Sequence, residues 1–184
     1  MKFWALTTIG LAALVAIGLA LQPAVGQERA RTTTGGTTAA AEDVKFIEKA
    51  ASGGLHEVHL GQLASERAND PEVKKFGQMM VTDHGKANKE LMAVAQQMGV
   101  KVPAQENAEH QAEHQKFMAM KGQAFDQAYI KHMVDDHKKD VEEFKKASDS
   151  AKDTRLRSFA SKTLPVVREH LTKAEQIASR LKVK

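Results

Sequence analysis

Apolar residues recur at steps of three and four through most of the 184-residue chain, from about residue 42 to residue 181. This spacing places them on one face of an α-helix, whereas a half-buried strand would need strict alternation. Turn-forming residues interrupt the spacing at Asn69-Asp70-Pro71, Gly99, Gly122 and Asp149-Ser150. The interruptions divide the chain into predicted helices over residues 42–68, 71–98, 107–121, 124–148 and 153–181.

Short turns join the first of these helices to the second and the fourth to the last, so each pair is expected to form antiparallel neighbours. Residues 101–106 instead form a longer connection, which leads into the short helix predicted over 107–121. A single long crossover in a four-helix bundle is the ferritin-like topology. The sequence therefore predicts an all-α, ferritin-like four-helix bundle whose long crossover carries an extra short helix.

The beginning of the chain differs in character from the rest. Lys2 precedes an apolar run, residues 6–21, and the small-residue site Ala24-Val25-Gly26 follows Pro23. This order predicts a secretory signal peptide over residues 1–26, cleaved near Gly26, with an uncleaved membrane anchor as the alternative. Residues 27–41 are rich in threonine and glycine and predict a flexible linker, so the bundle domain is expected over residues 42–184. The mature protein would then be periplasmic or secreted, without a membrane span.

Composition narrows the classes of function. The 27 Lys and Arg residues against 23 Asp and Glu give a formal net charge of +4, and no basic run is interleaved with aromatic residues. Nucleic acid is therefore not an expected partner. The chain has no cysteine, so it has neither a disulfide nor a cysteine nucleophile, and it has no Gly-x-Ser-x-Gly motif. These absences favour a protein that is not an enzyme.

A short pattern of valine, any residue, a carboxylate and histidine occurs three times and ends at His84, His137 and His170. Each of these histidines takes a position on the apolar face of its helix where the spacing expects a hydrophobic residue. The pattern therefore predicts three imidazoles that point into one helical core.

The first helix offers two candidate inner faces. One is apolar and carries Val44, Ile47, Ala51, Leu55 and Val58. The other consists of small residues, with Glu57 between Gly54 and Gly61. A glycine inside a helix costs ~1 kcal/mol relative to alanine, so the two glycines indicate that another backbone comes close there.

Two hypotheses follow for the function. In the first, Glu57, His84, His137 and His170 hold one metal ion for storage, buffering or defence; imidazole with carboxylate suits zinc, copper, iron or nickel. Their sequence neighbours Asp83, Asp136 and Glu169 would then be outer partners that orient the ligands.

In the second hypothesis the same residues form a metal-free layer of histidine and carboxylate hydrogen bonds. Such a layer can fix the register of the helices in an envelope scaffold, a stress protein or a protein that binds a partner, with a second copy of the chain as one possible partner.

Counting residues from the turn near Ser150 separates His137 from His170. They lie 13 and 20 residues away, which differ by ~10 Å along straight helices at 1.5 Å per residue. The count favours the metal-free layer. It places His137 beside Ser161, whose carbonyl loses its helical partner because Pro165 has no N–H, and it predicts a hydrogen bond between the two.

His110 and His114 are four residues apart in the short helix, a spacing that can place two imidazoles on one metal. Gln111 follows the first histidine where the zincin motif has glutamate, so we expect a pair on the surface.

Several motifs in one order resemble the bacterial domain-of-unknown-function family 4142. They are Gly53-Gly54-Leu55-His56-Glu57-Val58, Met79 to His84, Phe125 to Tyr129, Asp136-His137, and Leu164-Pro165 through His170-Leu171. The resemblance covers roughly residues 43–181 and implies an exported, ferritin-like protein, but it implies no activity. The Glu-x-x-His motifs of di-iron proteins are absent, because Val81, Val134 and Val167 precede the three histidines by three positions.

Overall fold

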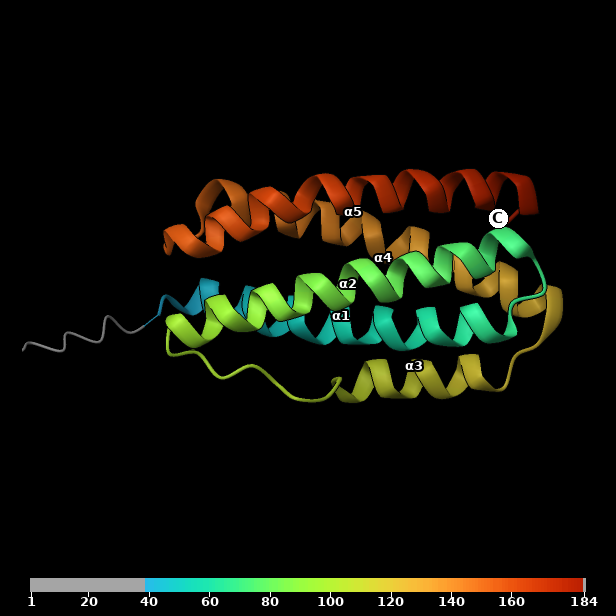
Figure 1. Ribbon diagram of the computed structural model, residues 1–184, viewed down its shortest axis with the longest axis horizontal. Coiled ribbons are helices and arrows are strands. Elements are labelled where there is room, and N and C mark those ends of the chain that lie inside the picture. The colour runs from blue at the N-terminus through green and yellow to red at the C-terminus, as the bar shows by residue number, and fades with distance from the viewer. Residues whose placement is uncertain (1–38, 184) are drawn as a thin grey trace, which may run out of the picture. The chain divides into compact units, whose positions relative to one another are not determined.

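The computed structural model describes residues 39–183. The predicted signal peptide and most of the predicted linker lie outside the described residues. Within residues 39–183 the chain forms five helices and no strand: α1 (Ala41–Arg67), α2 (Pro71–Gln97), α3 (Ala108–Met118), α4 (Gly122–Ser150) and α5 (Thr154–Leu181) (Figure 1). The order, type and approximate bounds of the predicted helices are confirmed.

The four long helices form two antiparallel hairpins that pack into one bundle. Helix α1 packs along α2 and α4 packs along α5, while α2 contacts α5 and α1 contacts α4 across the bundle. The short helix α3 lies against α1 on the outside, in the middle of the long connection between α2 and α4 (Figure 1). This is the predicted four-helix bundle with one long crossover.

Local signals account for the helix ends. The Asp70 side chain accepts hydrogen bonds from the backbone N–H groups of Glu72 and Val73 at 2.8 and 3.3 Å, and Pro71 occupies the first turn. Gly99 has a φ of +70°, a conformation that glycine adopts without steric cost, and it follows the end of α2. The predicted start and end of this helix are therefore confirmed.

An aspartate from each hairpin holds the turn of the other hairpin. Asp126 of α4 accepts hydrogen bonds from the backbone N–H groups of residues 69 and 70 at 3.0 and 2.8 Å. Asp43 of α1 accepts those of residues 152 and 153 at 3.0 and 2.8 Å. Both carboxylates are buried, and hydrogen bonds to ionised groups are the stronger ones in proteins. These contacts join the two hairpins at both ends of the bundle.

The core consists of two apolar clusters with a polar layer between them. One cluster surrounds the α1–α2 turn and the first half of α4, and it includes Leu60, Phe76, Met80, Tyr129 and Ile130. The other surrounds the α4–α5 turn and includes Ile47, Leu91, Phe144, Leu156 and Phe159. The buried polar side chains Glu57, His84, His137 and His170 lie between the clusters along the chain of each long helix.

Helix α1 buries its face of small residues, with Gly54, Glu57 and Gly61, whereas Leu55 and Val58 on the apolar face are only half-buried. The reason is the close approach of α2. A Cβ atom added to Gly61 would lie 2.7 Å from the Gly77 carbonyl oxygen, and one added to Gly77 would lie 2.6 Å from the Gly61 carbonyl oxygen. The prediction that a second backbone comes close is confirmed at Gly61 but is wrong at Gly54, where the nearest atoms belong to the Asn88 side chain. Small residues at the Gly61 crossing let Glu57 face the centre of the bundle.

We predict that Gly77→Ala destabilises the fold by about 1–3 kcal/mol, because a methyl group there meets backbone and forces α1 and α2 apart. Gly85→Ala in the same helix is the matched control, since no atom lies within 4 Å of its added Cβ. That variant should gain about 0.5–1 kcal/mol from its higher helix propensity. Urea unfolding of both variants measures the difference, and equal effects would show that the crossing is not tightly packed.

Candidate metal centre

The predicted site residues come together in the middle of the bundle. Glu57 of α1, His84 of α2, His137 of α4 and His170 of α5 are all buried, with exposed fractions between 0 and 7 %. Each long helix therefore contributes one side chain, and one nitrogen from each of the three imidazoles lies within 4.8 Å of the other two.

Two of the imidazoles have a fixed partner on their outer side. His137 Nδ1 donates its hydrogen to the Met133 carbonyl oxygen of its own helix at 2.9 Å. His170 Nε2 donates to Asp83 Oδ2, also at 2.9 Å. The second nitrogen of each ring, His137 Nε2 and His170 Nδ1, therefore presents a lone pair to the inside.

The inner nitrogens and Glu57 make short contacts with one another. His84 Nε2 lies 3.2 Å from His170 Nδ1, and His84 Nδ1 lies 2.8 Å from Glu57 Oε2. His137 Nε2 lies 3.3 Å from Glu57 Oε1. In a tetrahedral site with metal–nitrogen bonds of about 2.0 Å, neighbouring ligand atoms are ~3.3 Å apart. The 3.2 Å between His84 Nε2 and His170 Nδ1 and the 3.3 Å between His137 Nε2 and Glu57 Oε1 suit a shared ion, while the 2.8 Å contact is made by the other nitrogen of His84.

One of these contacts leaves two buried atoms unsatisfied. Among the described residues, His137 Nε2 and Glu57 Oε1 have no hydrogen-bond partner although both are buried. Both atoms present lone pairs when Glu57 is ionised, and an unsatisfied buried polar group costs about 1–3 kcal/mol. A cation between them would satisfy both.

Burial and crowding raise the pKa of the carboxyls in the layer. Burial raises the pKa of Glu57 well above 4.5, and the nearby charge of Asp136 adds to this, against a hydrogen bond with Asp140. The pKa of Asp140 is likewise raised well above its usual range by burial, with Glu57 and Asp136 adding. Oxygen atoms of these three carboxyls lie within 4.8 Å of one another. Without a cation nearby, the negative charge of this group of carboxyls must be reduced by protonation.

Burial lowers the pKa of all three histidines. The pKa of His137 falls well below 6.5 because of burial and then because of His84 and His170, and burial lowers that of His84 against nearby Asp140, Asp83 and Asp136. Burial and His84 lower the pKa of His170 to about 4, despite the opposing Asp83. The rings are therefore neutral at pH 7, which is the form that binds metals.

Two expectations from residue counting are wrong. His137 bonds to Met133 rather than to Ser161, which is exposed. The ring centroids of His137 and His170 are 5.4 Å apart, far closer than the ~10 Å difference in level that straight helices implied. The turn between α4 and α5 is not helical, so it adds no helical rise. From the facing ends of these helices, His137 and His170 lie 13 and 16 residues away, a difference in level of ~4.5 Å.

The predicted outer partners fall in different places. Asp83 bonds to His170, and Asp136 lies beside Glu57 in the carboxyl group. Glu169 is exposed and its carboxylate lies 3.9 Å from Lys173 Nζ, so it does not orient the site. Sequence reasoning missed Asp140, although its place four residues after Asp136 and three after His137 puts it on the same helix face.

The layer has little free space. A cavity of about 20 Å³ is lined by Glu57, Asp83, His84, Asp140 and His170 together with Asn88, Thr163 and apolar residues, and His137 is not part of its lining. Roughly 10–15 Å³ holds one water molecule, so the cavity has room for a single small species.

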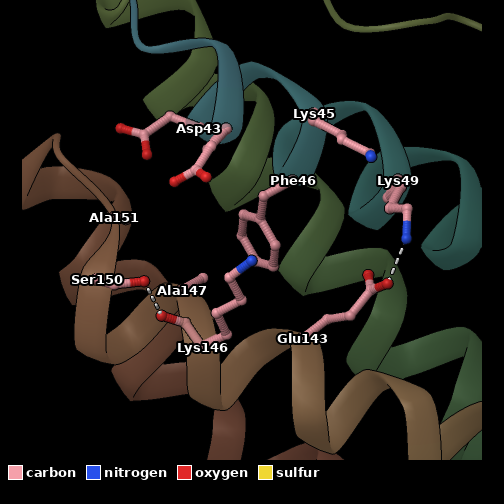
Figure 2. Close-up of a pocket in the computed structure, with 10 residues that line it drawn as sticks. Asp43, Lys45, Phe46, Lys49, Glu143, Lys146, Ala147, Ser150 and Ala151 are labelled. Carbon is pink, nitrogen blue, oxygen red and sulfur yellow. Dashed lines mark hydrogen bonds and ion pairs between the residues drawn. The ribbon is translucent and has the colours of Figure 1, made fainter.

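A larger pocket of about 260 Å³ lies at the surface between the start of α1 and the end of α4 (Figure 2). Two contacts join its lining residues: Lys49 pairs with Glu143, and the Ser150 hydroxyl donates to the Lys146 carbonyl at 2.8 Å. It contains no histidine and no candidate nucleophile and base in contact, so the candidate site remains in the core.

The fold and site together define an all-α bundle protein with a buried histidine and carboxylate network. The chain belongs to the family described as domain of unknown function DUF4142, whose family model matches residues 28–177. The suspected resemblance is thereby confirmed. A comparison with curated proteins finds no match. Between residues 39 and 183, no helix combines the length and apolarity that crossing a membrane requires.

Two solved structures share the fold at low sequence identity. A DUF305 fragment from Deinococcus radiodurans is 14% identical, with a TM-score of 0.67 over 77% of this chain and 98% of that one. A DUF305 protein from Streptomyces coelicolor, presumed to be secreted, is 12% identical, with a TM-score of 0.65 over 78% of this chain and 95% of that one. At these identities the likeness extends to the fold alone.

We predict that Glu57→Gln becomes progressively more stable than the unmodified, chelator-treated protein as the pH rises above 4.5. The folded pKa of Glu57 is raised, so the folded state holds a proton that the unfolded state has lost, and stability falls with rising pH until the folded pKa is passed. Glutamine keeps the neutral shape, and the gap should widen by at most about 1.4 kcal/mol per pH unit.

Urea unfolding between pH 5 and pH 8 measures this gap. Glu48→Gln, an exposed position on the same helix, is the control and should show no such widening. A gap for Glu57→Gln that stays constant with pH would mean that Glu57 is ionised in the metal-free fold.

Proposed function

We propose that this protein binds one transition-metal ion in the centre of its helical bundle, with His84, His137, His170 and Glu57 Oε1 as ligands. The observation that carries the proposal is the facing pair of buried, unsatisfied atoms, His137 Nε2 and Glu57 Oε1, at 3.3 Å. A proton on Glu57 Oε1 would pair these two atoms, but it would leave the lone pairs of His84 Nε2 and His170 Nδ1 facing each other at 3.2 Å. A cation attracts all of these lone pairs at once.

Each side chain has a defined part in the proposed site. The Met133 carbonyl and Asp83 take the outer hydrogens of His137 and His170, which fixes the ring orientations and the tautomers. Ionised Glu57 would accept the Nδ1 hydrogen of His84 and turn the third lone pair inward. Neutral imidazoles with nearby carboxylate suit zinc, copper, iron or nickel, and binding without an open reactive position fits storage, buffering or defence.

The alternative is a metal-free layer in a scaffold or partner-binding protein. In that arrangement a neutral Glu57 donates to His84 Nδ1, and His84 Nε2–H donates to His170 Nδ1 at 3.2 Å. Every N–H or O–H group of the layer then has an acceptor, but no hydrogen is left for His137 Nε2 to accept. The two functions differ in whether the layer gains stability from an added ion.

We predict that the chelator-treated protein regains one more equivalent of Zn²⁺ than His170→Gln does, and that bound Zn²⁺ raises its melting temperature. Ligand at 100 times its Kd stabilises a fold by about 2.7 kcal/mol. Asp83→Asn should weaken the binding about 10–100-fold, because Asp83 orients His170. Elemental analysis and calorimetric titration measure both quantities, with Cu²⁺ and Ni²⁺ as further probes.

Asp135→Asn is the matched control, since Asp135 is exposed and pairs with Lys131 on the bundle surface. It should bind as the unmodified protein does. Equal stoichiometry in the unmodified protein and in His170→Gln would leave the metal-free layer as the function of these residues.

We also propose that the protein is exported and matures near Gln27, with residues 27–41 as a linker ahead of the bundle domain. The support is the order of Lys2, the apolar run over 6–21 and the site ending at Gly26. The presumed secretion of the Streptomyces DUF305 protein agrees with this. We expect the intact mass of the exported protein to lack residues 1–26; a mass that includes them would indicate a membrane-anchored form.

A further inference from the structure

The histidines outside the central layer form a second group beneath helix α3. The chain has eight histidines, and those other than His84, His137 and His170 gather between α1, α3 and α4: His56, His59, His110, His114 and His132. His110 and His114 were expected as a pair on the surface. The ring of His110 instead stacks at 4.5 Å on that of His56, which is fully buried.

Three ligand atoms converge at the inner edge of this group. His56 Nε2 lies 3.3 Å from His132 Nε2 and 3.5 Å from Glu113 Oε2, and the three side chains come from α1, α4 and α3. On its outer side, His56 Nδ1 lies 3.2 Å from the buried Glu106 Oε1 and donates to it. The inner nitrogen of His56 therefore presents a lone pair to His132 and Glu113.

We propose that His56, His132 and Glu113 bind a second divalent transition-metal ion, and that this ion holds helix α3 against the bundle. The separations of 3.3 and 3.5 Å are close to the ~3.3 Å between neighbouring ligands of a tetrahedral ion with bonds of about 2.0 Å. Glu106 orients His56 in the way that an outer carboxylate orients a metal-bound histidine. The Glu113 side chain is 31 % exposed, which leaves a path for the ion and a position for water.

The state of His56 supports this role. Burial, followed by the neighbouring His110 and His132, lowers its pKa to about 4 against the opposing Glu106. The buried ring is neutral at pH 7 and able to act as a ligand.

Helix α3 has few other means of attachment. It is 11 residues long, and Phe117 is its only buried residue. Its other contacts are the stacking of the His110 and His114 rings on His56 and His59, and two hydrogen bonds. These run from Arg67 to the Met118 carbonyl at 2.9 Å and between His110 and Ser52 at 3.0 Å. Because so little apolar surface holds α3, a metal ligand contributed by Glu113 would account for much of its attachment.

This second site shares no ligand with the central one. His56 and Glu57 are adjacent in sequence, so their side chains point about 100° apart around α1, one towards α3 and the other into the core. Glu113 and His132 are not among the residues whose ligand atoms converge in the central layer. Either site can therefore be absent while the other binds.

Hydrogen exchange of the α3 amides with and without Zn²⁺ tests the proposal on the purified protein. We expect Zn²⁺ to slow exchange over residues 108–118 by at least about tenfold in the unmodified protein and in His170→Gln. Glu113→Gln should abolish this response and bind one equivalent of Zn²⁺ fewer. Glu109→Gln, the same change one turn earlier at an exposed position, is the matched control and should respond fully.

His132→Gln gives a second measurement from the other side of the site and should also lose the response. Exchange over α3 that is indifferent to Zn²⁺, or a response that survives in both Glu113→Gln and His132→Gln, would overturn the proposal. A response abolished by His170→Gln would overturn it too, because the effect would then come from the central site. The central site is tested separately: His170→Gln should bind one equivalent of Zn²⁺ fewer while the hydrogen exchange of α3 still responds to Zn²⁺.

Discussion

The removal of ionisable side chains from water is the constraint on which the rest of this bundle depends. Three imidazoles and the Glu57 carboxyl lie where the four long helices meet, and an unpaired polar group in such a place is costly. The fold meets most of this cost with outer hydrogen bonds to Met133 and Asp83. The buried atoms that still lack a hydrogen-bond partner on the inner side of the layer are His137 Nε2 and Glu57 Oε1. Because both present lone pairs, the chemistry of the layer favours a cation.

The apolar packing serves this layer as well as the stability of the bundle. The two core clusters lie on either side of it, while the close crossing at Gly61 and Gly77 brings α1 near enough for Glu57 to reach His84. Asp43 and Asp126 hold the turns at the two ends. The register of the four helices is thus fixed at both ends and in the middle, which sets the distances between the ligand atoms.

The two histidine groups place different demands on the fold. The central residues come from the four long helices, whose packing holds them whether or not an ion is bound. The group beneath α3 needs Glu113 from a short helix with a single buried residue, so its geometry depends on the docking of that helix. In both groups an outer acceptor fixes one nitrogen and leaves the other free. The same pattern of an outer acceptor and an inner lone pair therefore occurs both between the firmly packed long helices and beneath the weakly attached helix α3.

The sequence by itself determined the helices, their order and the three inward histidines, because periodic spacing and turn residues act locally along the chain. It also marked Glu57 and the glycine crossing, since glycine inside a helix needs a reason in packing. Only the tertiary structure decided which atoms meet. The level of His170 relative to His137 depended on the geometry of the α4–α5 turn, and the burial of His56 depended on α3 folding back over α1. These contacts join residues far apart in sequence, and their distances follow from how whole helices pack rather than from any local pattern.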